Sequence, residues 1–375
     1  MKILFVANTD WYLYNFRRSL AQFLFNQGWE IVMVSPAGPY VASLEKLGYR
    51  WVSWEVGRQT LLPFQELAAI NRLRAIYQQE KPDLVHHFTV KPVLYGSISA
   101  RLERVTGIVN CITGLGYIFL SSDLKAHLIR PLAKILYRLT LRSSNCRVIF
   151  ENESDREYFI KRKLVQLEKS HLIAGVGVDI EQFTVLPEPP GAPVIVFPAR
   201  MLWDKGVGVL VEAARILQAR QKVHVVLVGM PDPGNPTSID EAMLRRWEQE
   251  KIIEYWGWRD DMSAVFQQSH IVTLPSMYEG VPTALLEAAA CGKPLVATDI
   301  PGCRAIVKDG ITGLLVPVND PLALANALDK LVKDPNLRQR MGTAGRKLVE
   351  EQFTDTSVNE RTLAVYQALL SGGQE

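Results

Sequence analysis

Residues 274–292 read LPSMYEGVPTALLEAAACG, a stretch typical of a strand that ends in a loop and is followed by a helix. The apolar strand ends near Leu274, and the loop carries Glu279 and Gly280. Pro282 is suited to the first helical position, because the N–H that proline lacks would have no partner there. Strand, loop and helix in this order form the repeating unit of a parallel α/β sheet.

The same alternation extends from this segment in both directions. Across the C-terminal half of the chain it predicts strands at residues 194–198, 223–228, 252–256, 270–274, 294–297 and 313–316, with helices between them and a last helix at 357–370. Toward the N-terminus it predicts strands at 2–7, 30–35, 83–87, 107–112 and 147–150, and helices at 16–26, 64–80, 93–104 and 123–142. The pattern predicts an α/β chain with two Rossmann-like, doubly wound parallel sheets.

Residues 187–193, PEPPGAP, contain four prolines and a glycine, which disfavour regular structure and predict a linker. We therefore expect an N-terminal domain at 1–186 and a C-terminal domain at 194–355, facing one another across a cleft. Residues 356–375 are expected to form a C-terminal helix that packs back across the cleft. Ligands bind outside the carboxyl ends of parallel strands, so binding residues are expected in the loops that follow the strands.

Length and composition exclude several classes of protein. A chain of 375 residues with 48% hydrophobic content is long enough to bury two cores. The four cysteines show neither a disulfide pattern nor zinc-ligand spacing, which favours a reducing cytoplasm. No apolar run approaches the roughly 18 residues of a membrane span, and the N-terminal run is too short for a signal peptide. We expect a soluble or peripheral protein.

The charge of the chain is distributed unevenly. Residues 1–185 carry 23 Lys/Arg and 16 Asp/Glu, a net +7, whereas the remainder carries 19 and 23, a net −4. A basic N-terminal half is typical of a protein with an anionic partner such as nucleic acid or lipid headgroups, although a solvated surface produces the same imbalance.

The helix that is predicted to begin at Pro282 offers an anion-binding site. Its first N–H groups have no partner within the helix, and the helix dipole places about half a positive charge at that end. Gly280 lets a ligand approach the backbone closely, and the amides near Val281 and Thr283 are free to bind it. We expect phosphate oxygens to bind here.

Two carboxylates accompany this helix start. Glu279 lies in the loop and Glu287 inside the helix, so they can contact different parts of one elongated ligand. The alternative is that Glu279 only stabilises the helix N-terminus and Glu287 lies on the surface. Leucines and alanines flank Glu287, and an acid in so apolar a helix is costly unless it has a partner, which favours a functional role.

A second loop follows the first strand of the C-terminal domain. It reads FPARMLWDKG at 197–206 and carries Arg200 and Lys205. A planar guanidinium can bind two phosphate oxygens and an ammonium acts as a point charge, so the pair suits a diphosphate. A solvated basic loop is the alternative, which the anion-binding helix start on the same sheet disfavours.

These residues resemble glycosyltransferase family 4, whose members are retaining enzymes of the GT-B fold. Besides Arg200, Lys205 and the spacing of the two glutamates, the resemblance rests on YWGWRDD at 255–261 and DGITGLLVP at 309–317. It spans nearly the whole chain and is most specific between residues 195 and 320.

The resemblance implies a role for each residue. Arg200 and Lys205 would hold the donor pyrophosphate, Glu279 the transferred sugar and Glu287 the ribose, with Arg200, Lys205 and Glu279 as the catalytic set. The further donor-binding residues are Gly257, Trp258, Gly280, Val281, Pro282 and Thr283, and the backbone after Gly257 would contact the base. The donor is expected to be a nucleotide-diphosphate sugar, UDP-linked by family habit, and no metal or other cofactor is implied.

The reaction separates charge between the sugar and the leaving group. Arg200, Lys205 and the helix start are suited to stabilise the negative charge on the departing diphosphate. Since no nucleophile is obvious, retention implies, by analogy with the family, that the departing phosphate takes the acceptor proton on the same face.

On the acceptor side the chain departs from the family. CITGLGY at 111–117 places Thr113 where members often have a histidine, which leaves an acid–base role at that position open. His86 and His87, at the end of a predicted strand, either replace that histidine or are hydrogen-bonded structural residues. The first loop, at 8–15, lacks the family's glycines, and its aromatic residues either face the acceptor or pack. The acceptor-side candidates are Asp10, Tyr12, His86, Thr113 and Gly114.

Residues 124–142 form a basic amphipathic stretch. The membrane-facing candidates on it are Lys125, Arg130, Lys134, Arg138 and Arg142. Such a helix can lie against anionic lipid, although a core-packed helix with a solvated basic edge has the same pattern. The charges alternate with aliphatic rather than aromatic residues, which disfavours nucleic-acid binding.

Residues 86–92, HHFTVKP, and TGLG at 113–116 also resemble the branch of the family that extends lipid-diphosphate-linked sugars in polysaccharide or glycan assembly. We therefore expect transfer of a hexose or N-acetylhexosamine from a UDP-sugar to a polyisoprenyl-diphosphate-linked saccharide, by a cytoplasmic protein that is peripheral on the inner face of the cell membrane. The alternatives are transfer to a soluble acceptor and a non-catalytic regulator that binds nucleotide sugars.

Overall fold

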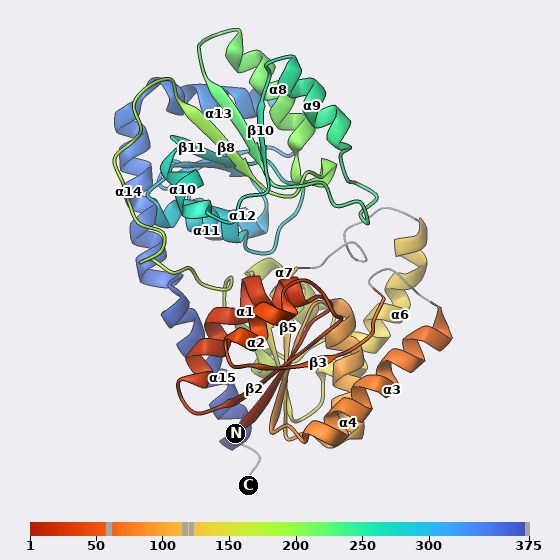
Figure 1. The fold of residues 1–375 in the computed structure, drawn as a ribbon. Coiled ribbons are helices and arrows are strands. Elements are labelled where there is room, and N and C mark those ends of the chain that lie inside the picture. The colour runs from red at the N-terminus through yellow and green to blue at the C-terminus, as the bar shows by residue number, and fades with distance from the viewer. Residues whose placement is uncertain (58–61, 115–118, 120–123, 372–375) are drawn as a thin grey trace. The chain divides into compact units, whose positions relative to one another are not determined.

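The structure is a computed structural model that describes residues 1–57, 62–114, 119 and 124–371, apart from the side chains of residues 124–126 and 128. The chain divides into two compact units, and Figure 1 labels many of their helices and strands. Unit 1 consists of Met1–Val176 and Asp355–Glu375, and unit 2 of Gly177–Thr354. Each unit contains one parallel sheet on which helices pack, so the expected α/β class with two doubly wound sheets is confirmed.

The sheet of unit 1 has the order β3-β2-β1-β4-β5-β6-β7, with all neighbours parallel. Its strands are β1 (Lys2–Val6), β2 (Glu30–Ser35), β3 (Arg50–Ser53), β4 (Leu84–Phe88), β5 (Gly107–Ile112), β6 (Cys146–Phe150) and β7 (Ser170–Leu172). The five predicted strands are present. The sequence did not predict β3 and β7, because these edge strands are short and partly exposed and lack a continuous apolar run.

Helices cover both faces of this sheet. They are α1 (Asp10–Phe25), α2 (Val41–Lys46), α3 (Pro63–Glu80), the π-helical turn η1 (Pro92–Gly96), α4 (Ser97–Leu102), α6 (Leu124–Leu141), α7 (Glu153–Lys161), the 3₁₀ turn η2 (Leu167–Lys169) and α15 (Asp355–Ser371). Successive strand residues point to opposite faces. Leu4 packs in the core beneath α3, α4, α6 and α7, and Phe5 in the core beneath α1, α2 and α15.

Helix α1 begins earlier than predicted. Thr9 is its N-cap, and the Thr9 hydroxyl accepts a hydrogen bond from the Tyr12 amide at 3.2 Å. The helix therefore runs from Asp10, whereas the sequence predicted a start at residue 16 and a loop at 8–15. The difference arises because aromatic residues hide the helical period in this first turn, and the helix start is set by the Thr9 cap instead of by apolar periodicity.

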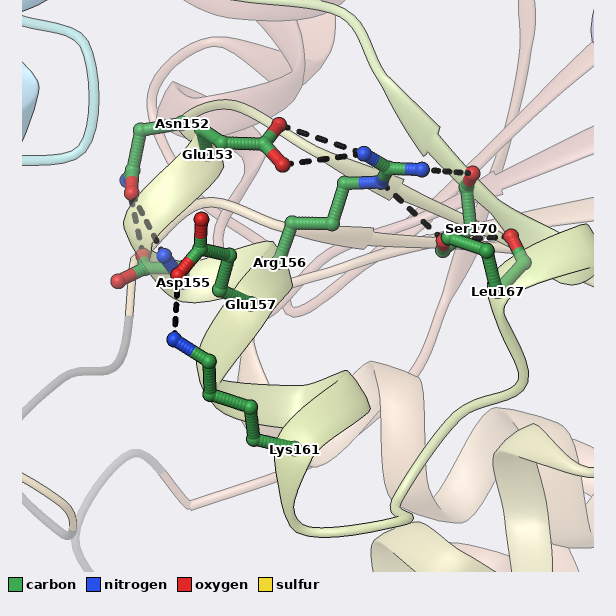
Figure 2. Close-up of polar contacts among 8 residues, drawn as sticks. All are labelled: Asn152, Glu153, Asp155, Arg156, Glu157, Lys161, Leu167 and Ser170. Atoms are coloured by element: carbon green, nitrogen blue, oxygen red, sulfur yellow. Dashed lines mark hydrogen bonds and ion pairs between the residues drawn. The ribbon is translucent and has the colours of Figure 1, made fainter.

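Helix α7 is tied to its neighbours by side-chain contacts (Figure 2). Asn152 is the N-cap, and its carboxamide oxygen accepts a hydrogen bond from the Asp155 amide at 2.9 Å. Arg156 donates from Nε to the Ser170 hydroxyl of β7 at 3.2 Å and forms an ion pair with Glu153 at 3.1 Å. These contacts fix the turn that follows β6 and hold α7 against the last strand.

The sheet of unit 2 has the order β10-β9-β8-β11-β12-β13 and is also parallel. Its strands are β8 (Val194–Pro198), β9 (His224–Val228), β10 (Glu254–Gly257), β11 (Ile271–Leu274), β12 (Leu295–Thr298) and β13 (Gly313–Val316). Its helices are η3 (Trp203–Lys205, 3₁₀), α8 (Val207–Gln218), α9 (Glu241–Gln249), α10 (Met262–Gln267), α11 (Thr283–Ala290), α12 (Pro301–Ile306), α13 (Pro321–Lys333) and α14 (Pro335–Gln352). All six predicted strands are present, with ends shifted by at most two residues.

The chain passes from unit 1 to unit 2 ahead of the proline-rich segment. The crossing lies at Val176–Gly177, and residues 187–193 lie inside unit 2. Arg346 of α14 donates to the carbonyl oxygens of Ile180 at 3.3 Å and Phe183 at 2.7 Å, which attaches the preceding segment to unit 2. The chain returns at Asp355, and α15 packs on α1, β5 and β6 of unit 1.

Candidate active site

Two loops of unit 2 lie where the strand order of its sheet reverses. β8 and β11 are neighbours, yet the chain continues from β8 to β9 on one side and from β11 to β12 on the other. In doubly wound sheets ligands bind at such a switch point, outside the carboxyl ends of the strands. Arg200 and Lys205 follow β8, and Glu279 follows β11. The structure thus brings the three predicted catalytic residues to one edge of one sheet.

The backbones of these two loops are in direct contact. The Met277 amide donates to the Asp204 carbonyl oxygen at 2.9 Å. Gly206 adopts a φ of 80°, and a Cβ atom there would lie 2.1 Å from the Pro275 carbonyl oxygen. Only glycine permits both that conformation and that approach, so Gly206 fixes the spacing of the two loops.

Lys205 and Glu279 form an ion pair between the loops. Lys205 Nζ lies 2.6 Å from Glu279 Oε1, and the side chains are 18% and 11% exposed. The Ser276 hydroxyl donates to the same oxygen at 2.7 Å. Glu279 Oε2 has no hydrogen-bond partner among the described residues, so one carboxylate oxygen remains available to a ligand.

Arg200 is held at one end of its guanidinium group. Its Nη1 donates to Asp232 Oδ2 at 2.7 Å, and its side chain is 45% exposed. Asp232 belongs to the loop after β9, which is joined to the Arg200 loop because the Met201 amide donates to the Met230 carbonyl oxygen at 2.9 Å. No described residue bonds the remaining guanidinium nitrogens, which leaves them available to an anion.

A second side-chain contact joins the same loops. The Tyr278 hydroxyl donates to Asp204 Oδ2 at 2.7 Å. Burial, the hydrogen bond to Asp204 and the nearby carboxylates raise the pKa of Tyr278 above its usual value. The phenol therefore stays protonated and keeps this contact over the whole physiological pH range.

Helix α11 begins at Thr283, so Pro282 is the residue that precedes the helix rather than its first residue. The difference arises because Pro282 has a ψ of 111°, outside the helical range. Its carbonyl oxygen already accepts from the Leu285 amide at 3.0 Å. The first amides of the helix, at Thr283 and Ala284, have no partner among the described residues and can bind an anion.

Glu287 lies half-buried in α11, one helical turn before the end of the helix. No described residue forms an ion pair or hydrogen bond with its carboxylate. Burial raises the pKa of the Glu287 carboxyl to about 8. A half-buried acid without a partner is costly, and hydroxyl groups of a bound ligand would supply the missing donors.

Gly257 and Gly280 of the predicted site differ in what sets their backbone positions: Gly257 has a positive φ, and Gly280 contacts helix α12. Gly257 ends β10 with a φ of 67° and lies beside the exposed Trp258. The Gly280 carbonyl oxygen lies so close to Gly302 of α12 that a Cβ on Gly302 would be 1.7 Å away. Val281 is buried, so only its backbone is available to a ligand.

Asp10 and Tyr12, which the sequence offered as acceptor-side candidates, lie in α1 and have partners within unit 1. The Asp10 carboxylate is buried and accepts hydrogen bonds from the amides of Tyr40 at 2.7 Å and Trp11 at 2.8 Å. The Tyr12 hydroxyl accepts a hydrogen bond from the buried Arg17. Arg17 lies 3.4 Å from Glu151 Oε1, which follows β6.

Both histidines of β4 are buried. His87 bonds the Tyr77 hydroxyl and Asn110 Oδ1, each at 2.8 Å, and burial lowers its pKa to about 4. His86 contacts the Tyr366 hydroxyl of α15 through Nδ1, and its Nε2 has no partner. Burial, together with Arg17 and His87, lowers the pKa of His86 well below its usual value. His87 therefore has the contacts of a structural residue, which was one of the two alternatives.

His86, whose Nε2 has no partner, is one of the residues that line a cavity with room for about one water molecule. Arg17, Cys111, Asn359 and Thr362 also line it. Thr113 and Gly114 follow β5, at the edge of the sheet where the carboxyl ends of its strands lie, and both are partly exposed. No side-chain hydrogen bond joins Thr113 to another described residue.

Helix α6 exposes an apolar stripe. Leu132, Ile135 and Leu139 are 58%, 53% and 60% exposed, although Ala133 and Tyr137 on the opposite side are buried in the core. Of the basic candidates, Arg138 and Arg142 are exposed, Arg130 and Lys134 are partly exposed, and the Lys125 side chain lies outside the described residues. The helix thus packs in the core on one side and exposes a second apolar surface on the other. A core-packed helix with only a solvated basic edge does not account for that second surface.

Sequence reasoning missed two residues of this site. Ser276 bonds Glu279, and Asp232 pairs with Arg200. The signal for Ser276 was its place between the end of β11 and Glu279. No sequence signal marked Asp232, because its loop joins the site through backbone contacts.

Among the described residues, no group of three or more His, Cys, Asp or Glu side chains could hold a metal ion. Among the helices of the described ranges, none combines the length and the apolar character required to cross a bilayer.

Both halves of the chain match models of glycosyltransferase families. Residues 178–348 match the family described as glycosyl transferases group 1, and residues 2–152 match glycosyl transferase 4-like. Together these models cover most of both units.

The chain is similar to two proteins named for transfer to diphosphoundecaprenol-linked sugars. It is 27% identical over 384 residues to the N,N'-diacetylbacillosaminyl-diphospho-undecaprenol alpha-1,3-N-acetylgalactosaminyltransferase of Campylobacter jejuni, with 99% of each chain covered. It is 27% identical over 300 residues to the UDP-Gal:alpha-D-GlcNAc-diphosphoundecaprenol alpha-1,3-galactosyltransferase of Escherichia coli, with 76% of this chain and 75% of that one covered. In fold it resembles a sucrose-phosphate synthase from Thermosynechococcus elongatus, with a TM-score of 0.83, 20% identity, and 99% and 100% coverage.

Proposed function

Since this chain belongs to glycosyltransferase family 4 and has the GT-B fold, we propose that it transfers a hexose or N-acetylhexosamine from a UDP-sugar to a polyisoprenyl-diphosphate-linked saccharide. Transfer retains the anomeric configuration and takes place at the inner face of the cell membrane. The observation that carries the proposal is the position of Arg200 and of the Lys205–Glu279 pair at the switch point of unit 2.

The donor diphosphate binds between the loop after β8 and the first turn of α11. An ammonium group has three N–H donors, so Lys205, which contacts Glu279 through one of them, has two more that can reach phosphate oxygens. Arg200 adds its free guanidinium nitrogens, and the amides of Thr283 and Ala284 add the end of a helix dipole. Glu287 accepts from the ribose hydroxyls, because its carboxylate lacks donors of its own.

Charge stabilisation is the main contribution of these residues to the reaction. As the bond between the anomeric carbon and the phosphate oxygen breaks, negative charge collects on the diphosphate and positive charge on the sugar ring. Arg200 and Lys205 stabilise the diphosphate, and Glu279 lies on the sugar side. The departing phosphate oxygen takes the proton of the acceptor hydroxyl on the same face, which gives retention. Since two cations already face the diphosphate, transfer is expected to continue in EDTA.

The names of the relatives support a lipid-linked acceptor. The Campylobacter jejuni and Escherichia coli proteins are both named for acceptors that carry a diphosphate and an undecaprenol, and the former matches this chain over nearly its full length. The latter is also named for a UDP-sugar, which supports UDP as the nucleotide.

Helix α6 supports a place at a membrane surface. Its exposed Leu132, Ile135 and Leu139 would enter the boundary between headgroups and acyl chains, while Arg138 and Arg142 lie near anionic headgroups. Exposed apolar stripes of this kind are unusual on proteins that have no surface partner. The basic net charge of residues 1–185 adds a long-range attraction to anionic lipid.

Transfer assays test the proposal. The protein is first screened against nucleotide sugars by thermal unfolding, because a donor that binds the native state raises the melting temperature. The donors found are then incubated with short-chain polyisoprenyl-diphosphate-linked saccharides, and the products are identified by mass spectrometry and their anomeric configuration by NMR. We expect a product one sugar longer, with the configuration of the donor.

Other outcomes separate the alternatives. Transfer to free saccharides at rates equal to those with lipid-linked ones would indicate a soluble acceptor. Stabilisation by a nucleotide sugar without release of UDP under any condition would indicate a regulator rather than an enzyme. A product with inverted anomeric configuration would contradict only the retaining mechanism, and the rest of the proposal would stand.

A further inference from the structure

The carboxylate of Glu279 is bonded asymmetrically. Oε1 accepts from the Ser276 hydroxyl at 2.7 Å and from Lys205 Nζ at 2.6 Å. Oε2 has no partner among the described residues. Two donors on one oxygen fix the rotation of the carboxylate, so the other oxygen points in one defined direction.

Ser276 is itself held in place. It is fully buried just after β11, and its carbonyl oxygen accepts from the hydroxyl of Thr298, the last residue of β12. Gly302 of α12 lies against the carbonyl oxygens of Glu279 and Gly280, where a Cβ would be 2.6 Å and 1.7 Å away. The segment that carries Glu279 is therefore fixed from two neighbouring elements, and the Ser276 hydroxyl cannot turn to solvent.

The two donors to Glu279, the Lys205 ammonium and the Ser276 hydroxyl, respond differently to a bound diphosphate. The Lys205 ammonium is attracted to the phosphate oxygens, which weakens its contact with Glu279, whereas the neutral serine hydroxyl is not attracted and stays. Hydrogen bonds to an ionised carboxylate are also stronger than those to a neutral acceptor. Ser276 is thus the donor that holds Glu279 while the site is occupied.

We propose that Ser276 is a positioning residue that fixes Glu279 Oε1, so that Oε2 accepts a hydrogen bond from a hydroxyl group of the transferred sugar. The inference rests on the proposed donor site, and it adds which oxygen meets the sugar and which residue holds it there. Ser276 acts through Glu279 and does not touch the substrate.

The test compares Ser276→Ala with the wild-type protein and with Ser269→Ala. Ser269 is a matched control, because it is also fully buried in unit 2 and its hydroxyl donates to the Phe266 carbonyl oxygen at 2.7 Å, at the opposite end of β11. Calorimetry measures binding of UDP and of the preferred UDP-sugar, and assays give kcat and KM separately.

For Ser276→Ala we expect affinity for the UDP-sugar to fall about 10-fold or more, as for loss of a hydrogen bond to a charged group, with affinity for UDP changed less than about 2-fold. We also expect kcat to fall, because the Glu279 carboxylate loses the donor that holds its orientation. Ser269→Ala should leave both affinities and kcat unchanged.

Equal losses of UDP and UDP-sugar affinity would overturn the proposal, because they would indicate a general disturbance of the loop. Unchanged UDP-sugar affinity and kcat would overturn it as well. If Ser276→Ala does not fold, Ser276→Cys, which has a weaker donor of similar size, should show the same selective loss at smaller size. Failure of the wild-type protein to bind any UDP-sugar would instead contradict the proposed function.

Discussion

Lys205 and Glu279 are 74 positions apart in the chain, yet their side chains form an ion pair of 2.6 Å. The pair exists because β8 and β11 are neighbours in the sheet and their following loops share backbone contacts. In the proposed function, one loop supplies the cation for a phosphate and the other the carboxylate for a sugar, which puts the pair beside the reactive bond of the nucleotide sugar.

Removing either of the two cations that we propose to bind the phosphates should lower turnover. For Lys205→Ala and Arg200→Ala we expect kcat/KM to fall about 100-fold or more, comparable to losing one charge-stabilising donor. Steady-state kinetics with saturating acceptor measures the effect. The matched control is Lys333→Ala, which removes an exposed lysine of α13 that also pairs with a carboxylate. Near-normal turnover in both site variants would remove the assignment.

Gly302→Ala should displace the loop that carries Glu279. The new Cβ would lie 1.7 Å from the Gly280 carbonyl oxygen, so loop or helix must move by more than 1 Å, a shift that can cost about 100-fold in turnover. Gly345→Ala in α14 is the control, because its Cβ would meet nothing closer than 3.6 Å and alanine favours the helix. Equal activity of the two variants would contradict the close contact.

Glu287 should make the stability of the unliganded protein depend on pH. Its carboxyl has a pKa of about 8 in the native state, above the 4.5 of an unfolded chain. The native state thus binds the extra proton between these values, so this contribution to stability is complete below pH 4.5 and is lost as pH rises toward 8. Glu287→Gln should flatten that part of the curve of melting temperature against pH.

The same residue should release a proton when UDP binds at pH 7. Ribose hydroxyls that donate to the carboxylate favour its ionised form and lower its pKa. Calorimetric titration in buffers of different ionisation enthalpy measures the release, and Glu287→Gln should abolish it. Equal release by the variant would show that the ribose binds elsewhere.

Helix α6 should bind anionic vesicles. Replacing Arg138 and Arg142 by Gln removes two charges worth about 1 kcal/mol each near such a surface, so partitioning should fall about 30-fold at low salt. Replacing Leu132, Ile135 and Leu139 by Ser should lower it further and independently of salt. Flotation with vesicles measures both effects, with Leu322→Ser of α13, an equally exposed leucine, as the control. Unchanged flotation of all variants would exclude α6 as the contact.

The sequence predicted the sheets better than the site. The strands at 194–198 and 313–316 have the predicted bounds, because buried strands of a parallel sheet are continuous apolar runs. The start of α1 was missed, since Thr9 acts through a cap and not through apolar periodicity. The strand order, which places Lys205 beside Glu279, is not encoded in local pattern and required the structure.

Residue roles that depend on loop conformation were also beyond the sequence. Arg200, Lys205 and Glu279 could be singled out because their charges follow predicted strands. Ser276 and Asp232 are ordinary loop residues until the backbone brings them within hydrogen-bond distance of Glu279 and Arg200. The burial of His87 by Tyr77 and Asn110 likewise depends on packing between elements far apart in the chain.

The return of the chain to unit 1 at Asp355 has a consequence for synthesis on the ribosome. Unit 2 has all its strands and helices once residue 354 has emerged, whereas the core of unit 1 still lacks Tyr366 and Leu369 of α15. His86 also lacks its hydrogen-bond partner, the Tyr366 hydroxyl, until α15 has been synthesised. The half that is translated first is therefore the half that finishes folding last, and a nascent chain that stalls before α15 exposes an incomplete apolar layer to chaperones.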